Sequence, residues 1–155
     1  MFAKSLCLSL FILSAQAADA TEVPPVIKTF YSNFNLPASA PNAELIAATT
    51  TEDWQSCSAA EKCRGRDASA KVFAGFAKAI PNMKNEIKDV VVAGDRIVVR
   101  GVVSGTPTGE FFGVPHTGRS FSVLAIDIHE MRGGRIARTW HVEDWAEALS
   151  QLRAK

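Results

Sequence analysis

Four titratable side chains lie in two apolar-rich runs near the end of the chain, where an apolar sheet does not need them. Asp127 and His129 belong to the first run, and His141 and Asp144 belong to the second. Proton transfer next to a carbonyl needs a base with a pKa tuned towards neutrality and a donor for the enolate oxygen. Burial of a carboxylate in an apolar pocket raises its pKa in that direction. These four residues are therefore the candidate catalytic groups, with aspartates as bases and histidines as acids or donors.

The two runs are expected to form a long hairpin. They cover residues 120–131 and 135–144, and the segment between them contains Gly133 and Gly134, which suit a tight turn. Alternate side chains of a strand share a face, so Asp127 and His129 can line one pocket wall together.

In the second run, His141 and Asp144 have opposite parity and point the same way only if a bulge interrupts the strand. Each candidate also has a structural alternative. Asp144 suits the N-cap of a following helix, and His129 can be a satisfied core histidine.

Other segments must position these groups. Apolar side chains recur at helical spacing in the first half of the chain and at its end, whereas from residue 83 their period shifts towards two. Helices followed by antiparallel strands predict an α+β domain, in which N-terminal helices pack on the concave face of a cone-shaped, curved antiparallel sheet and enclose a pocket. Helices are expected over 24–34, 43–48, 68–80 and 145–152, and Asn42 and Asp67 can cap the second and third of them. Further strands are expected over 83–92 and 96–103, and a polar connection is expected over 49–53.

Aromatic side chains supply the candidate substrate contacts. Residues 106–119 are rich in glycine and proline and are expected to form a loop, which nevertheless contains Phe112 and His116. An apolar loop usually folds back on the core or on a ligand. Together with Trp54 and Trp140, these two residues are the candidate substrate-binding groups, although His116 has simple exposure as its alternative.

The N-terminus is typical of a signal peptide. Lys4 precedes a short apolar run, and small residues at Ala17 and Ala20 offer two cleavage sites. An uncut membrane anchor is the alternative, but the run is too short to span a bilayer comfortably. The sequence therefore predicts a signal peptide over residues 1–20 and one domain over 21–155. We expect a periplasmic or secreted protein without stable membrane association after cleavage.

Cleavage would leave two cysteines, Cys57 and Cys63, in an oxidising compartment. This close pair predicts a disulfide, because its spacing matches neither a redox motif nor a common zinc pattern. Histidines at metal-binding spacing are missing from the sequence, so no metal is expected. The formal net charge of +1 comes from 17 basic and 16 acidic residues without a basic block, which offers no support for nucleic-acid binding.

Several short motifs stand out in the sequence. They are residues 109–118 (GEFFGVPHTG), 126–128 (IDI) and 134–136 (GRI), Trp140 and Asp144, and the pairs at 65–66 and 151–152. These motifs resemble the SnoaL-like polyketide cyclases, which belong to the nuclear transport factor 2-like superfamily beside the ketosteroid isomerases. The resemblance covers residues 23–152, nearly the whole mature chain.

The resemblance implies a cone-shaped pocket, frequent dimerisation through the sheet, and ring closure by aldol condensation without metal or cofactor. It also implies an acidic acid/base residue near the end of the last long strand. The family pattern Trp-Asp-x-x-Asp reads here as Trp140-His141-Val142-Glu143-Asp144, so the second aspartate is kept and the first is histidine.

Two functions follow as hypotheses. One is an exported ester cyclase-like or polyketide cyclase-like protein that performs aldol-type cyclisation or isomerisation on a small apolar carbonyl or ester compound. The other is a non-catalytic periplasmic binding protein for a small apolar ligand. Titratable groups inside the pocket favour the first, and a pocket lined only by apolar side chains favours the second. A homodimer is expected in either case, by resemblance.

Overall fold

The computed structural model describes residues 22–35, 43–58 and 62–154. The expected signal peptide and the expected cap Asn42 lie outside these residues. The helices are α1 (Pro25–Ser32), α2 (Ala43–Thr49), α3 (Arg66–Ala79) and α4 (Trp145–Arg153), and the strands are β1 (Thr50–Cys57), β2 (Cys63–Gly65), β3 (Lys84–Ala93), β4 (Arg96–Gly105), β5 (Phe121–Arg132) and β6 (Arg135–Glu143).

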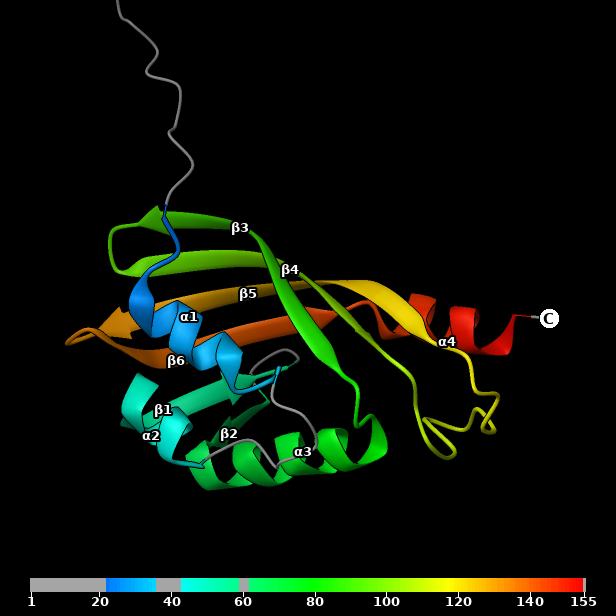
Figure 1. Ribbon diagram of the computed structural model, residues 1–155. Coiled ribbons are helices and arrows are strands. Elements are labelled where there is room, and N and C mark those ends of the chain that lie inside the picture. The colour runs from blue at the N-terminus through cyan, green and yellow to red at the C-terminus, as the bar shows by residue number, and fades with distance from the viewer. Residues whose placement is uncertain (1–21, 36–42, 59–61, 155) are drawn as a thin grey trace, which may run out of the picture.

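The strands form one curved, unclosed sheet in the order β2-β1-β6-β5-β4-β3. Figure 1 shows α1, α2 and α3 on one side of this sheet, while α4 follows β6 at the far end of the hairpin. Both layers bury apolar side chains against each other, as an α+β domain requires. The expected architecture is therefore confirmed, with the helices packed into the concave side.

Strand β1 corrects the expectation of a polar connection over residues 49–53. It pairs antiparallel with β2 but parallel with β6, so the sheet is mixed rather than wholly antiparallel. Only Thr50, Trp54 and Cys57 of this strand are buried, and its register shifts between Thr50 and Gln55. A polar strand with an interrupted pattern shows no alternation of apolar and polar residues, so the local sequence does not predict it.

The β5–β6 hairpin is confirmed, and its turn follows from two glycines. Arg132 pairs with Arg135, and the intervening Gly133 and Gly134 have φ of 59° and 74°. Two successive positive φ angles are characteristic of the tight turn that matches strand twist, and glycine adopts them without steric cost. The turn fixes the register of the hairpin that carries the candidate residues.

The start of α3 differs from its prediction. Gly65 occupies the N-cap position without a side-chain hydrogen bond, and Asp67 lies in the first turn instead. A negative charge there still favours the helix, because it faces the positive end of the helix dipole.

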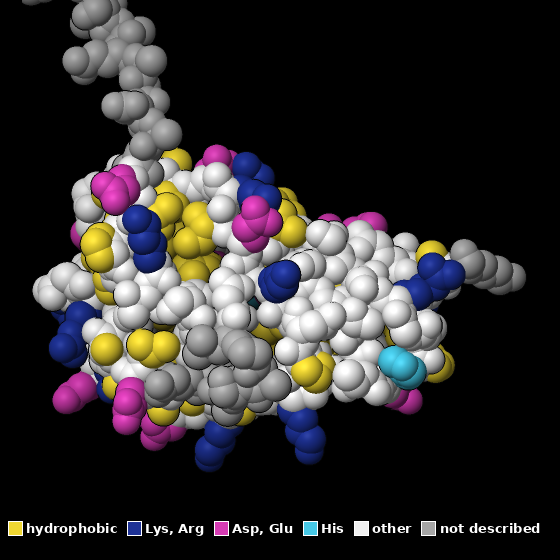
Figure 2. Space-filling view, in the orientation of Figure 1, with side chains coloured by type: hydrophobic (Ala, Val, Ile, Leu, Met, Phe, Trp, Pro, Cys, Tyr) yellow, Lys and Arg dark blue, Asp and Glu magenta, His cyan; other side chains and the backbone are white. Residues whose placement is uncertain are grey.

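Two hydrophobic clusters fill the space between the sheet and the helices. The expected apolar loop folds back on one of them through Phe111 and Val114, which also form a short bridge with each other. Within the described residues, the helices are all too short or too polar to span a bilayer. In Figure 2, basic and acidic side chains are interspersed over the visible face, as the balanced composition suggests.

Candidate active site

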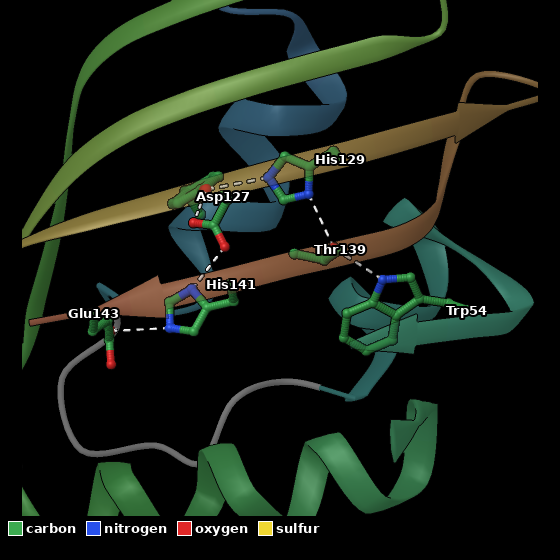
Figure 3. Close-up of polar contacts among 7 residues, drawn as sticks. Trp54, Asp127, His129, Thr139, His141 and Glu143 are labelled. Carbon is green, nitrogen blue, oxygen red and sulfur yellow. Dashed lines mark hydrogen bonds and ion pairs between the residues drawn. The ribbon is translucent and has the colours of Figure 1, made fainter. Parts of the chain in front are cut away.

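The candidate residues of the hairpin meet on the concave face of the sheet. Asp127 on β5 lies directly opposite His141 on β6, and His129 lies opposite Thr139. Figure 3 shows these four side chains turned towards one another, with Trp54 reaching them from β1. The structure therefore brings together three of the four predicted catalytic residues, because strand register places their side chains on one face.

Asp127 is the centre of this group. Its carboxylate is 6% exposed and receives a hydrogen bond on each oxygen. The Tyr31 hydroxyl donates to Oδ2 over 2.5 Å, and His141 Nδ1 lies 2.7 Å from Oδ1. Tyr31 comes from α1, so the first helix and the last hairpin jointly hold this carboxylate. Two strong donors on one buried carboxylate favour its ionised form.

A second set of contacts continues from Tyr31 towards β1. His129 Nε2 lies 3.2 Å from the Tyr31 hydroxyl, and His129 Nδ1 lies 3.0 Å from Thr139 Oγ1. The Trp54 indole N–H then donates to Thr139 Oγ1 over 3.1 Å. His129 is fully buried and bonded on both ring nitrogens, which fits its expected alternative as a satisfied core histidine.

His141 lies between two carboxylates. Besides Asp127 at Nδ1, Glu143 Oε1 lies 3.4 Å from Nε2. That second distance is long for an N–H···O hydrogen bond, so the contact is a loose ion pair. A ligand oxygen could replace it at Nε2 without disturbing the tighter bond to Asp127.

Buried His129 and half-buried His141 have opposite pKa shifts. Burial lowers the pKa of His129 to about 4, and the charge of Asp127 only partly offsets this, so His129 is neutral at pH 7. Burial alone would lower the pKa of His141 too, but the hydrogen bond with Asp127 and the negative charges of Asp127 and Glu143 outweigh it and raise the pKa to about 10. His141 is therefore an imidazolium at pH 7.

The shifts of Asp127 and Tyr31 agree with this arrangement. Burial acts to raise the pKa of Asp127, but the hydrogen bond and positive charge of His141 prevail and hold it below its ordinary value. Burial and the neighbouring Asp127 charge raise the pKa of Tyr31 far above its ordinary value, so Tyr31 remains a hydrogen-bond donor. The site thus combines a carboxylate, a cation and a neutral donor.

A cavity of about 470 Å³ opens onto this group. Asp127, His141 and Glu143 contribute to its wall, whereas most of the wall is apolar. Its volume is in the range of small-molecule sites, and a mainly apolar wall with a few convergent polar groups is typical of them. The apolar and aromatic lining residues are Phe30, Phe34, Trp54, Val72, Phe73, Phe76, Met83, Val103, Phe112, Val142 and Trp145.

Of the predicted substrate-binding residues, Trp54 and Phe112 lie in this wall. His116 lies outside it, in the 106–119 loop, where its Nδ1 is 3.0 Å from the Pro107 carbonyl oxygen. Trp140 lies outside it as well. Its ring has the guanidinium groups of Arg96 and Arg138 at 5.2 and 5.5 Å from its centroid, which is a cation–π arrangement.

Asp144, the fourth predicted catalytic residue, lies outside the cavity wall. It occupies the N-cap of α4, where its side chain accepts a hydrogen bond from the Glu147 backbone N–H over 2.9 Å. This is the structural role that the sequence also predicted for it.

Three residues of the site were not among the sequence candidates: Tyr31, Thr139 and Glu143. The alternation of side chains along a strand offered a signal for two of them. Thr139 and Glu143 lie two residues before and after His141, so all three side chains share one face of the strand. Tyr31 had a weaker signal as the single tyrosine of the chain, next to the apolar stripe of the expected first helix.

The predicted disulfide is present between Cys57 and Cys63, at the ends of β1 and β2. Ser58 and Arg64, the next residues along the chain, line the cavity, so the disulfide lies beside its wall. Among residues 22–35, 43–58 and 62–154, no cluster of three His, Cys, Asp or Glu side chains is arranged to hold a metal ion.

Solved structures share this fold. IdmH of Streptomyces antibioticus, a candidate polyketide cyclase, is 28% identical with a TM-score of 0.73, over 83% of this chain and 96% of that chain. A candidate SnoaL-like polyketide cyclase from a Jannaschia species is 19% identical with a TM-score of 0.72, over 90% and 99% of the two chains. AclR of Streptomyces galilaeus, a candidate hydroxylase, is 23% identical with a TM-score of 0.70, over 82% and 78%.

The last two likenesses show the fold alone, and one fold can support different reactions. No curated protein matches the chain. The family described as SnoaL-like polyketide cyclase matches residues 26–152, from the first helix to the end of the last. Because this match includes the sheet, the cavity and the hairpin that carries Asp127 and His141, the chain belongs to the SnoaL-like polyketide cyclase family.

Proposed function

We propose that the protein catalyses cofactor-independent acid/base chemistry on a small apolar carbonyl or ester compound, as an aldol-type cyclisation or an isomerisation. One observation carries the proposal: His141 stands between two carboxylates in the wall of a mainly apolar cavity. Removal of a proton next to a carbonyl needs this pairing of a base with a donor for the developing oxyanion.

The catalytic role of each residue follows from the hydrogen bonds that its side chain already makes. Both oxygens of Asp127 accept hydrogen bonds, whereas among the described residues the Glu143 carboxylate makes only the loose contact with His141. Glu143 is therefore the base that takes the proton from the carbon next to the carbonyl. The electron pair moves into the new C=C bond, and the oxygen that becomes negative accepts the proton on His141 Nε2. Asp127 holds His141 in place through Nδ1 and balances its charge.

The non-catalytic binding protein is the competing function. An apolar wall would suit such a ligand equally well, but a binding site for an apolar compound does not need buried charges, whose desolvation is costly. Asp127, His141 and Glu143 in the wall therefore favour the enzyme.

We also propose an exported homodimer. The disulfide is compatible with an oxidising compartment. Leu124 and Ile128, on the outer face of β5, are 46% and 36% exposed, and they alternate with buried residues that face the core. A second copy of the chain could cover these side chains across the outer face of the sheet.

The experiment measures exchange of carbon-bound protons for deuterium in a panel of enolisable ketones and diketones by proton NMR in D2O. It requires no knowledge of the natural substrate, because abstraction alone produces the signal. Glu143→Gln and His141→Asn should each lower the exchange rate by about 100-fold or more. Glu130→Gln is the matched control, a carboxylate on β5 that pairs with Arg96 outside the cavity.

Enzyme-dependent exchange that is lost in Glu143→Gln but kept in Glu130→Gln supports the proposal. Ketones that raise the melting temperature of the protein but never exchange would point to the binding protein instead. Equal exchange in wild type and Glu143→Gln would remove Glu143 from the reaction.

A further inference from the structure

Five buried side chains from four elements form a continuous chain of hydrogen bonds. It runs from Trp54 on β1 through Thr139 on β6, His129 on β5 and Tyr31 on α1 to Asp127 on β5, in steps of 3.1, 3.0, 3.2 and 2.5 Å. None of the five is more than 6% exposed. The role of each hydrogen in such a chain follows from the donors and acceptors available.

The direction of the chain follows from its two ends. An indole N–H only donates, so Trp54 gives its hydrogen to Thr139. At the other end, an ionised Asp127 can only accept hydrogen bonds, so Tyr31 donates its single hydroxyl hydrogen to that carboxylate. His129 Nε2 must then carry a hydrogen and donate to the Tyr31 oxygen.

The middle of the chain fits this direction as well. With its hydrogen on Nε2, neutral His129 has a lone pair on Nδ1 and accepts the hydroxyl hydrogen of Thr139. The oxygen of Thr139 is thereby free to accept from Trp54. Every hydrogen in the chain has an acceptor, and every step points towards Asp127.

The reverse direction leaves a hydrogen without a partner. Asp127 would have to be protonated and donate to Tyr31, Tyr31 would donate to His129 Nε2, and His129 Nδ1–H would donate to Thr139. Thr139 Oγ1 would then accept from both Trp54 and His129, which leaves its own hydroxyl hydrogen without an acceptor in the chain. Buried polar hydrogens without acceptors are strongly disfavoured.

We propose that Trp54, Thr139, His129 and Tyr31 form a one-way hydrogen-bond chain that keeps Asp127 ionised, so that Asp127 orients His141 and takes no proton from the substrate. Trp54 and Thr139 are then positioning residues, since they act on the reacting atoms only through the others. The consequence for turnover rests on the proposed function, but the tautomer of His129 and the ionisation of Asp127 do not.

The tautomer of His129 and the ionisation of Asp127 can both be measured in the wild-type protein by NMR. In 15N-labelled protein, two-bond proton–nitrogen spectra report which ring nitrogen of His129 carries the hydrogen, and we expect Nε2. In 13C-labelled protein, the Asp127 carboxyl signal should stay at its ionised position from pH 5 to pH 8. A hydrogen on Nδ1 of His129, or a protonated Asp127 at pH 7, would overturn the proposal.

The matched variants are Thr139→Val and Thr139→Ser. Valine keeps the shape but supplies no hydroxyl, so Nδ1 of His129 should lose its hydrogen bond while Tyr31 still holds the hydrogen on Nε2. The nitrogen-15 signal of Nδ1 should shift, and exchange catalysis should fall by about 10-fold to 100-fold through poorer orientation of His141. Serine restores the hydroxyl and should restore both the Nδ1 signal and the exchange rate. A valine variant that keeps the Nδ1 signal and the exchange rate of wild type would contradict the proposal, and if it does not fold, the wild-type spectra test the proposal by themselves.

The two proposals fail in different ways. If the NMR results are as expected but no ketone exchanges, the proposed function fails and the chain stands. If exchange depends on Glu143 but the carboxyl group of Asp127 titrates between pH 5 and pH 8, the function stands and the one-way chain fails.

Discussion

The stability of the protein should pass through a maximum near pH 6.5, because the pKa values of His129 and His141 shift in opposite directions. The folded-state pKa of His141 is raised from 6.5 to about 10, so the folded protein binds a proton there that the unfolded chain releases. This contribution is complete below pH 6.5 and is lost as the pH rises towards 10. The pKa of His129 is lowered from 6.5 to about 4, so its neutral form contributes above pH 6.5 and is lost as the pH falls towards 4.

Linkage sets the size of both effects. One proton bound differently by the folded and unfolded states changes the free energy of unfolding by about 1.4 kcal/mol per pH unit. We therefore expect stability to fall at about that slope between pH 7.5 and pH 9, and to rise at about that slope between pH 4.5 and pH 6. The lowered pKa of Asp127 steepens the loss at the acid end.

Urea unfolding curves at a series of pH values measure these slopes. The variant His141→Asn isolates the alkaline side, because its amide nitrogen can replace Nδ1 as donor to Asp127 but does not titrate. Subtracting the curve of the variant from that of wild type should leave a slope of about 1.4 kcal/mol per pH unit above pH 7. Identical slopes for both proteins between pH 7.5 and pH 9 would show that His141 is not held as an imidazolium.

Three further predictions concern structure and assembly. The oxidised protein should contain no free thiol at Cys57 or Cys63, and reduction should lower its stability by about 2 kcal/mol in chemical denaturation; two titratable thiols before reduction would refute this. Asp144→Ala should cost about 1 kcal/mol of stability and Asp144→Asn nearly nothing, because asparagine caps a helix as well as aspartate does; equal losses would argue against the cap. Leu124→Glu should convert a dimer to a monomer in light scattering, and a wild-type monomer would contradict the proposed dimer.

The sequence predicted the parts of the fold that have strong local patterns. The long hairpin, the β3–β4 pair and the helices follow from apolar periodicity and from glycines at turns. Strand β1 was missed because only three of its eight residues are buried, so its partners on β2 and β6 decide its conformation. Pairing between distant segments leaves no signal in local sequence.

The candidate site was predictable up to the contribution of the hairpin. Alternation along β5 placed Asp127 and His129 on one face, but it could not say which side chains of β6 would lie beside them. The family pattern drew attention to Asp144 instead. The register of the β5–β6 pair determines this, because it places Asp127 directly opposite His141. Tyr31 and Trp54 enter the site from segments 96 and 85 residues away from Asp127 and Thr139, respectively, so only the folded chain reveals their contacts.

The central claim, that proton transfer belongs to His141 and Glu143 rather than to Asp144, is tested most directly by comparing two variants. Deuterium exchange in the same ketone is measured by NMR for Glu143→Gln and Asp144→Asn. We expect Glu143→Gln to lose about 100-fold or more in rate, while Asp144→Asn keeps its cap and most of its activity. A folded Asp144→Asn that loses exchange, beside a Glu143→Gln that retains it, would contradict the claim.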